Sequence, residues 1–167
     1  MLKTAQQKIY VIANNKLIEA VASDRKQKLP VEIRDHVATF HERFFNLEPD
    51  EQYNQSQIIK ALYLCDETAK IQHRELTESG YYSGIVSGNI SQRVTVDSIQ
   101  LDINQSPWYV KYYGKQSIMR STSTTIRSLI TEAYIRDLGT ISDHNPHGFL
   151  LERWKILENK DLSVVPR

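Results

Sequence analysis

Histidine is the residue type in this chain with the widest chemistry, because imidazole binds metals and transfers protons near neutral pH. His36 and His41 lie five positions apart and therefore diverge on a helix, and no second histidine stands four positions after His41. His144 and His147 share a polar turn with Asp143. Three loop residues without further ligands make a poor metal cage. The sequence predicts solvated or hydrogen-bonded histidines and no metal site.

The other potential nucleophiles also lack a catalytic setting. Cys65 is the only cysteine, which excludes an internal disulfide and a multi-cysteine zinc site. We expect a buried thiol, the alternative being an intermolecular disulfide. The serine and threonine run at 121–125 has no nucleophile elbow around it, and the glycines at 80, 84 and 88 are not followed by the Lys-Ser/Thr of a phosphate loop. No catalytic or cofactor-binding residue is predicted.

Charge and composition restrict the partners. The 167 residues carry 21 Lys and Arg against 20 Asp and Glu, a net charge of +1, so no cationic excess is available for a phosphate backbone. The aromatic cluster at 108–113 could stack single-stranded nucleic acid, but core packing is the simpler interpretation. We expect no direct nucleic-acid binding. The sequence has no apolar run long enough for a transmembrane helix, and residues 1–8 lack the apolar centre of a signal peptide.

These side chains must be positioned by helices that come first and strands that follow. Two short apolar runs around Asn14-Asn15 predict a hairpin at about 8–20, and residues 21–29 read as a polar connector that ends at Pro30, a residue suited to a first helical turn. The clearest helix follows at 31–47. Its apolar stripe consists of Ile33, Val37, Phe40, Phe44 and Leu47.

Two more helices and a sheet are predicted beyond that point. A second helix, capped by Asn54 or Ser56, carries Ile58, Leu62 and Cys65 on one face, and a third runs from about 66 to 78 and stops at Ser79-Gly80. Polar and apolar residues then alternate, as in a strand. The apolar positions change phase between residues 97 and 99, which indicates a β-bulge or a strong bend. Strands are expected at about 91–136.

The last element, residues 149–158, is ambiguous. Leu150, Trp154 and Leu157 suit a helix, whereas Leu150, Trp154 and Ile156 suit one face of a strand. The order of elements predicts one α+β domain over residues 1–167, with helices at about 31–79 packed on one face of an antiparallel sheet at about 91–158.

Several strings, in this order and spacing, resemble the TraK proteins of conjugative transposons, and the resemblance spans nearly the whole chain. The strings are residues 31–37, 39–41, 79–85, 87–91, 112–116, 145–149 and 152–154. TraK belongs with the VirB-eight-type inner-membrane subunits of type IV secretion systems. In those proteins a cytoplasmic tail and one transmembrane helix precede a periplasmic domain.

The resemblance implies a nuclear-transport-factor-2-like fold, with about three helices against a strongly curved antiparallel sheet of about four strands. It also implies that residue 149 onward is a strand and that the N-terminal hairpin is a departure from the fold. The implied protein is non-enzymatic. It is a single-pass inner-membrane subunit whose anchor lies outside this chain, and its periplasmic domain self-associates and contacts other secretion subunits.

The family's Asn-Pro-x-Gly turn maps onto Asn145, Pro146 and Gly148. Proline fixes φ, glycine permits a positive φ and asparagine can bond the backbone ahead, so the turn should be rigid. It either docks partners or only shapes the entry to the last strand. We also expect an exposed contact face on the helix at 31–47, with Arg34, His41 and Phe45 as candidates.

The rival hypothesis is a ligand-binding or isomerase-like enzyme, because cone-shaped folds of this kind also host catalysis. It requires an inward acid or base such as Asp97, Asp102 or His73 in an apolar pocket. A third possibility is an adaptor that binds DNA or a partner's peptide on the curved sheet.

Overall fold

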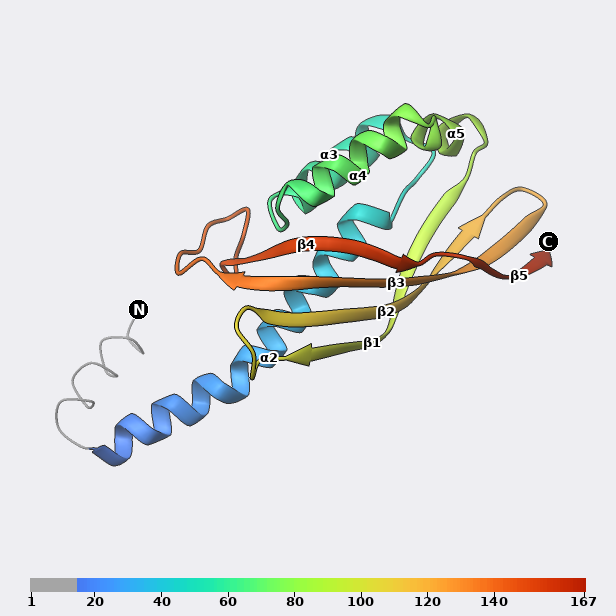
Figure 1. Cartoon of the computed structure of the whole chain (residues 1–167). Coiled ribbons are helices and arrows are strands. Elements are labelled where there is room, and N and C mark those ends of the chain that lie inside the picture. The colour runs from blue at the N-terminus through green and yellow to red at the C-terminus, as the bar shows by residue number, and fades with distance from the viewer. Residues whose placement is uncertain (1–14) are drawn as a thin grey trace.

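A computed structural model of the chain describes the backbone of residues 15–167 and the side chains from residue 27 onward. In this part of the chain all the helices precede all the strands. The helices are α2 (Asn15–Phe45), α3 (Glu51–Leu62), α4 (Glu67–Glu78) and α5 (Tyr81–Ser87); the strands are β1 (Ser91–Asp102), β2 (Trp108–Met119), β3 (Ser123–Asp137), β4 (Phe149–Glu158) and β5 (Asp161–Pro166). Figure 1 shows α2 crossing one face of the sheet, while α3, α4 and α5 lie together beside β4.

The sheet is antiparallel throughout, in the order β1-β2-β3-β4, and β5 pairs with the first residues of β3. The described residues thus form five strands instead of the predicted four, because the sheet continues past 158 to Pro166. The register of β1 against β2 shifts between Val96 and Ser98, where the change of sequence phase predicted a bulge. β1 bends strongly along its length (Figure 1), so that prediction is confirmed.

Helix α2 supplies the central part of the core. The predicted stripe is fully buried, and Phe40 and Phe44 pack on Trp154 of β4 with ring centroids 5.0 and 5.1 Å apart. Leu47, the last residue of that stripe, lies beyond the helix and forms a bridge with Gln92 at the start of β1. The stripe therefore packs the helix against the sheet and continues into the first strand.

The start of α2 corrects two predictions. Residues 15–20, which were expected in the second arm of a hairpin, are helical, and the first arm lies outside the described residues. The connector at 21–29 is also helical, and Pro30 lies inside the helix instead of in its first turn. The physical reason is propensity: residues 16–29 are rich in Ala, Leu, Lys, Glu and Gln, which outweighs one proline.

The shorter helices are capped by side chains. Asp50 caps α3 by accepting from Tyr53 N–H, and Asp66 caps α4 by accepting from Thr68 N–H, whereas Asn54, a predicted cap, is buried and bonds the Glu48 backbone. The third predicted helix and its stop at Gly80 match α4, but α5 was not predicted. None of the described helices is both long and apolar enough to cross a lipid bilayer.

Strand β4 settles the ambiguous last element. It contains a bulge, since Tyr134 pairs with Glu152 while Glu132 pairs with Lys155, and Arg153 at the bulge has a φ of 52°. The bulge puts Leu151 and Trp154, three positions apart, on the same buried face, and Leu150 is not part of the core. Because the bulge places buried residues three positions apart, the strand has the apolar spacing of a helix, which is why the pattern was ambiguous.

Candidate functional site

The turn at 145–148 is built around the side chain of Asn145. Its Oδ1 accepts a hydrogen bond from the Gly148 N–H at 3.1 Å, and its Nδ2 donates to the Phe149 carbonyl at 2.7 Å. Gly148 has a φ of 69°, the region that glycine adopts without a Cβ penalty. The roles expected from the sequence for Asn145 and Gly148 are therefore confirmed. Asn145 and Gly148 are buried, and Pro146 is exposed.

The loop that carries this turn is fastened to helix α2 and to the end of α3. His147 Nε2–H donates to the Asp35 carboxylate at 2.8 Å. His36, one residue further along α2, donates from Nε2 to the Leu64 carbonyl at 3.1 Å and meets the Phe149 ring edge-on at 5.8 Å. Three segments far apart in the sequence therefore converge at one place.

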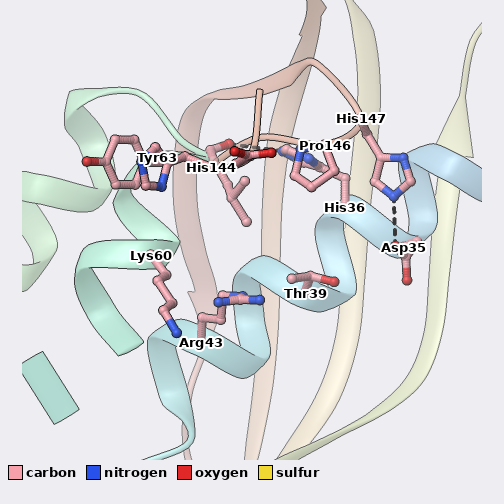
Figure 2. A pocket seen from close by; sticks show the side chains of 11 residues that line it. Asp35, His36, Thr39, Arg43, Lys60, Tyr63, His144, Pro146 and His147 are labelled. Carbon is pink, nitrogen blue, oxygen red and sulfur yellow. Dashed lines mark hydrogen bonds and ion pairs between the residues drawn. The ribbon is translucent and has the colours of Figure 1, made fainter. Parts of the chain in front are cut away.

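A cavity of about 460 Å³ lies where these segments meet (Figure 2). One wall is formed by Tyr63 and His144, whose rings stack with centroids 4.3 Å apart and an interplanar angle of 9°. The lining residues are Asp35, His36, Thr39 and Arg43 from α2, Lys60, Tyr63 and Leu64 from α3 and its end, and Asp143, His144, Pro146 and His147 from the loop.

Some charged side chains of the cavity have hydrogen-bonding or ionic partners among the described residues, and others do not. Asp35 is paired with His147, whereas Arg43 and Lys60 have no hydrogen-bonding or ionic partner among the described residues. Burial lowers the pKa of His36 to about 4, with a smaller contribution in the same direction from His147, so His36 is neutral at neutral pH. The cavity thus contains two basic side chains that have no partner among the described residues.

Two of the three predicted contact residues on α2 are not exposed. His41 and Phe45 are 1% and 6% exposed, because they lie between α2 and the sheet. His41 stacks on Tyr112 at 3.7 Å, donates from Nδ1 to the Val37 carbonyl and accepts at Nε2 from the Thr131 hydroxyl. The expectation of an exposed face therefore fails for both, since the curved sheet covers more of the helix than its main stripe. Arg34 is exposed but does not line the cavity.

The residues of α2 that do line the cavity were missed. Asp35, Thr39 and Arg43 recur every four positions, which places them on one side of a helix. That spacing was visible in the sequence. Its meaning was not, because the facing segments, the end of α3 and the turn at 145–148, are distant in the chain.

The catalytic alternative requires an acid or a base in a cavity between the helices and the sheet. The small cavity there, about 70 Å³, is lined by Phe44, Phe45, Leu47, Gln72, Leu76, Tyr81, Tyr82, Gln92, Gln116, Ile156 and Asn159, which include no acid and no histidine. Asp97 and Asp102 are exposed, and His73, whose ring nitrogen bonds the Tyr82 hydroxyl at 3.0 Å, lines a separate cavity of about 360 Å³. Among the described residues, no group of three or more His, Cys, Asp or Glu side chains is placed to hold a metal ion.

An α+β chain in which one long helix lies across a curved antiparallel sheet, with shorter helices at its side, has the nuclear-transport-factor-2-like fold, as expected. Solved structures share it, and two of them come from type IV secretion systems. The soluble domain of TrwG of the type IV secretion machinery from Bartonella grahamii superimposes with a TM-score of 0.62 at 16% identity, covering 80% of this chain and 96% of that one. CagV from Helicobacter pylori strain 26695, a VirB8 homolog of the type IV secretion system, gives 0.58 at 14% identity, covering 80% and 99%.

At these identities the likeness establishes the fold. No protein-family model matches the sequence, and no curated protein sequence matches it.

Proposed function

We propose that this chain is the periplasmic domain of a single-pass inner-membrane subunit of a type IV secretion system, of the TraK kind found in conjugative transposons. The observation that carries the proposal is the fold likeness: the chain covers 96% and 99% of two domains that belong to such systems. The sequence strings that resemble TraK support it independently. In this role the domain is an assembly part that associates with itself and with other channel subunits, has no catalytic activity and does not bind nucleic acid directly.

The turn at 145–148 and the adjoining cavity are the proposed contact site. A rigid turn loses little conformational entropy on binding, which favours its use in recognition. Pro146 is exposed on it, while Asn145 and Gly148 hold its shape from within. Arg34, exposed on the same stretch of α2, is a further proposed contact.

The test is DNA transfer by cells in which the gene is replaced by variants. Pro146→Glu places a charge on the exposed turn without removing its internal hydrogen bonds, and it should reduce transfer by at least about tenfold, a loss of roughly 1.4 kcal/mol of contact energy. Pro166→Glu is the matched control, because Pro166 is an exposed proline on β5, at the opposite end of the sheet from the 145–148 loop (Figure 1). Both variants should unfold at the wild-type urea concentration.

The outcomes separate the two parts of the proposal. Normal transfer by Pro146→Glu would remove the turn from the contact site. Normal transfer after deletion of the whole gene would refute the secretion function itself. If Pro146→Glu loses transfer, an unchanged urea midpoint of the purified domain assigns the loss to the contact. A lowered midpoint assigns it to folding.

A further inference from the structure

Arg43 and Lys60 stand in the last turns of two different helices and line the same cavity. Figure 2 shows their charged ends at the same end of it, away from the His147–Asp35 pair. Some other cations among the described residues have acidic partners, such as Lys115 with Asp97 at 2.6 Å, whereas others, such as Lys70 and Arg74, are exposed to solvent. Lys60 is exposed, but Arg43 is half-buried, and its guanidinium has five N–H donors with no acceptor among the described residues, so these donors are available to a ligand.

The remaining lining groups define the anion that fits. Asp35 accepts a hydrogen bond from His147, but Asp143 also lines the cavity and disfavours a group that carries two charges on one centre, such as a phosphate ester. A carboxylate carries one charge and matches the planar fork of an arginine. The stacked Tyr63 and His144 rings, together with Pro146 and Leu64, provide apolar contact for the carbon atoms that carry such a carboxylate.

A purely structural explanation exists for both cations. Positive side chains near helix C-termini are favoured by the helix dipole, and both residues are in that position. This explanation accounts for stability alone. It predicts no ligand, and it does not explain why the two cations face one cavity.

We propose that the cavity binds the carboxylate of an acidic peptide segment of another protein, seated between Arg43 and Lys60 with its chain against Tyr63 and Pro146. The proposal rests on the proposed function and specifies the chemistry of the partner at that site. It places the Asn145–Gly148 turn at the rim of a carboxylate pocket, which gives the turn a defined ligand to hold.

The experiment is a titration of the isotope-labelled chain with the peptide acetyl-Glu-Glu-Glu-amide, followed by amide chemical shifts at pH 7.5. Saturable shifts are expected at Thr39, Arg43, Tyr63 and His144. The double variant Arg43→Gln/Lys60→Gln should raise the Kd by at least about tenfold, as expected for loss of charge-assisted hydrogen bonds. Lys70→Gln/Arg74→Gln on α4 is the matched control, because both cations are exposed and line none of the cavities described here. The control should leave the Kd unchanged.

A charge-reversal variant tests the same site by a gain of binding. Arg43→Glu/Lys60→Glu should lose the acidic peptide and bind acetyl-Lys-Lys-Lys-amide at the same amides. Three results would overturn the proposal: no saturable shift at the cavity, the same Kd in the wild type and the Gln double variant, or equal displacement of the peptide by inorganic phosphate. Binding to phosphatidylglycerol vesicles through these residues, without peptide binding, would assign the cavity to a membrane and would also overturn it.

The same variants separate this inference from the proposed function. If Pro146→Glu abolishes DNA transfer while Arg43→Gln/Lys60→Gln transfers normally and binds no peptide, the carboxylate pocket is wrong and the contact role of the turn stands. If gene deletion leaves transfer intact, the secretion function is wrong whatever the peptide does.

Discussion

His36 and His41 are held in the folded chain as neutral imidazoles. Burial lowers the pKa of His36 to about 4 and that of His41 to about 3, from an ordinary value of 6.5. The backbone hydrogen bonds of the two rings, to Leu64 and Val37, act in the opposite direction but do not compensate. Neither histidine was predictable as buried, because imidazole is polar and both lie beside the apolar stripe instead of within it.

These shifts predict that the domain loses stability as pH falls from about 6.5 towards 4. In that window the unfolded chain binds protons that the folded chain excludes, so the stability present above pH 6.5 is lost progressively. Each histidine should contribute a loss on the order of 2 kcal/mol by pH 5. Urea unfolding at pH 7.5 and pH 5 measures it, and His36→Gln should remove part of the difference. Asp66, whose pKa is lowered below 3.8, acts only at lower pH. Equal unfolding midpoints at the two pH values would contradict the prediction.

At the scale of elements, sequence patterns predicted what local periodicity determines. The apolar stripe of α2, the stop of α4 at Gly80 and the bulge of β1 all followed from residue spacing. The failures came from interactions between segments. The bulge of β4 is fixed by Asp66, whose carboxylate accepts from the Arg153 N–H at 3.0 Å across 87 positions of the chain. β5 has no buried side chain at all, so its pairing with β3 has no apolar signature.

The loop at 138–148 offers a test of how the turn is held. Gly148 and Gly139 both have positive φ, 69° and 73°, but a Cβ on Gly148 would lie 2.4 Å from the Thr140 carbonyl oxygen, while one on Gly139 would meet nothing within 4 Å. Gly139→Ala should therefore lose about 1 kcal/mol through φ strain alone, and Gly148→Ala at least about 3 kcal/mol because the loop must also shift. Urea unfolding of the two variants measures the difference. Similar losses would show that the turn is less tightly packed than its geometry indicates.

At the scale of the molecule, the candidate site exists only because the fold joins three distant segments. Residues 35–43, 60–64 and 143–147 each carry ordinary polar patterns, and no spacing along the chain connects them. The Asn145–Gly148 turn entered the prediction through a family resemblance, and its internal geometry agreed with the physical roles of its residues. The cavity beside it is formed only when these three segments come together in the folded chain.

The proposed self-association belongs to the scale of the whole molecule, and Cys65 bears on the form that it would take. This cysteine is 3% exposed, and burial raises the pKa of its thiol to about 12, so the folded chain presents no thiolate for an intermolecular disulfide. Sedimentation of the purified domain over a range of concentrations should show a weak equilibrium between monomer and oligomer that is the same with and without reductant. Weak association would suffice if the proposed membrane anchor raised the local concentration of the domain to the order of mM. An oligomer that disappears in reductant would contradict the burial of Cys65. A strict monomer at the highest concentration would refute self-association through this domain alone.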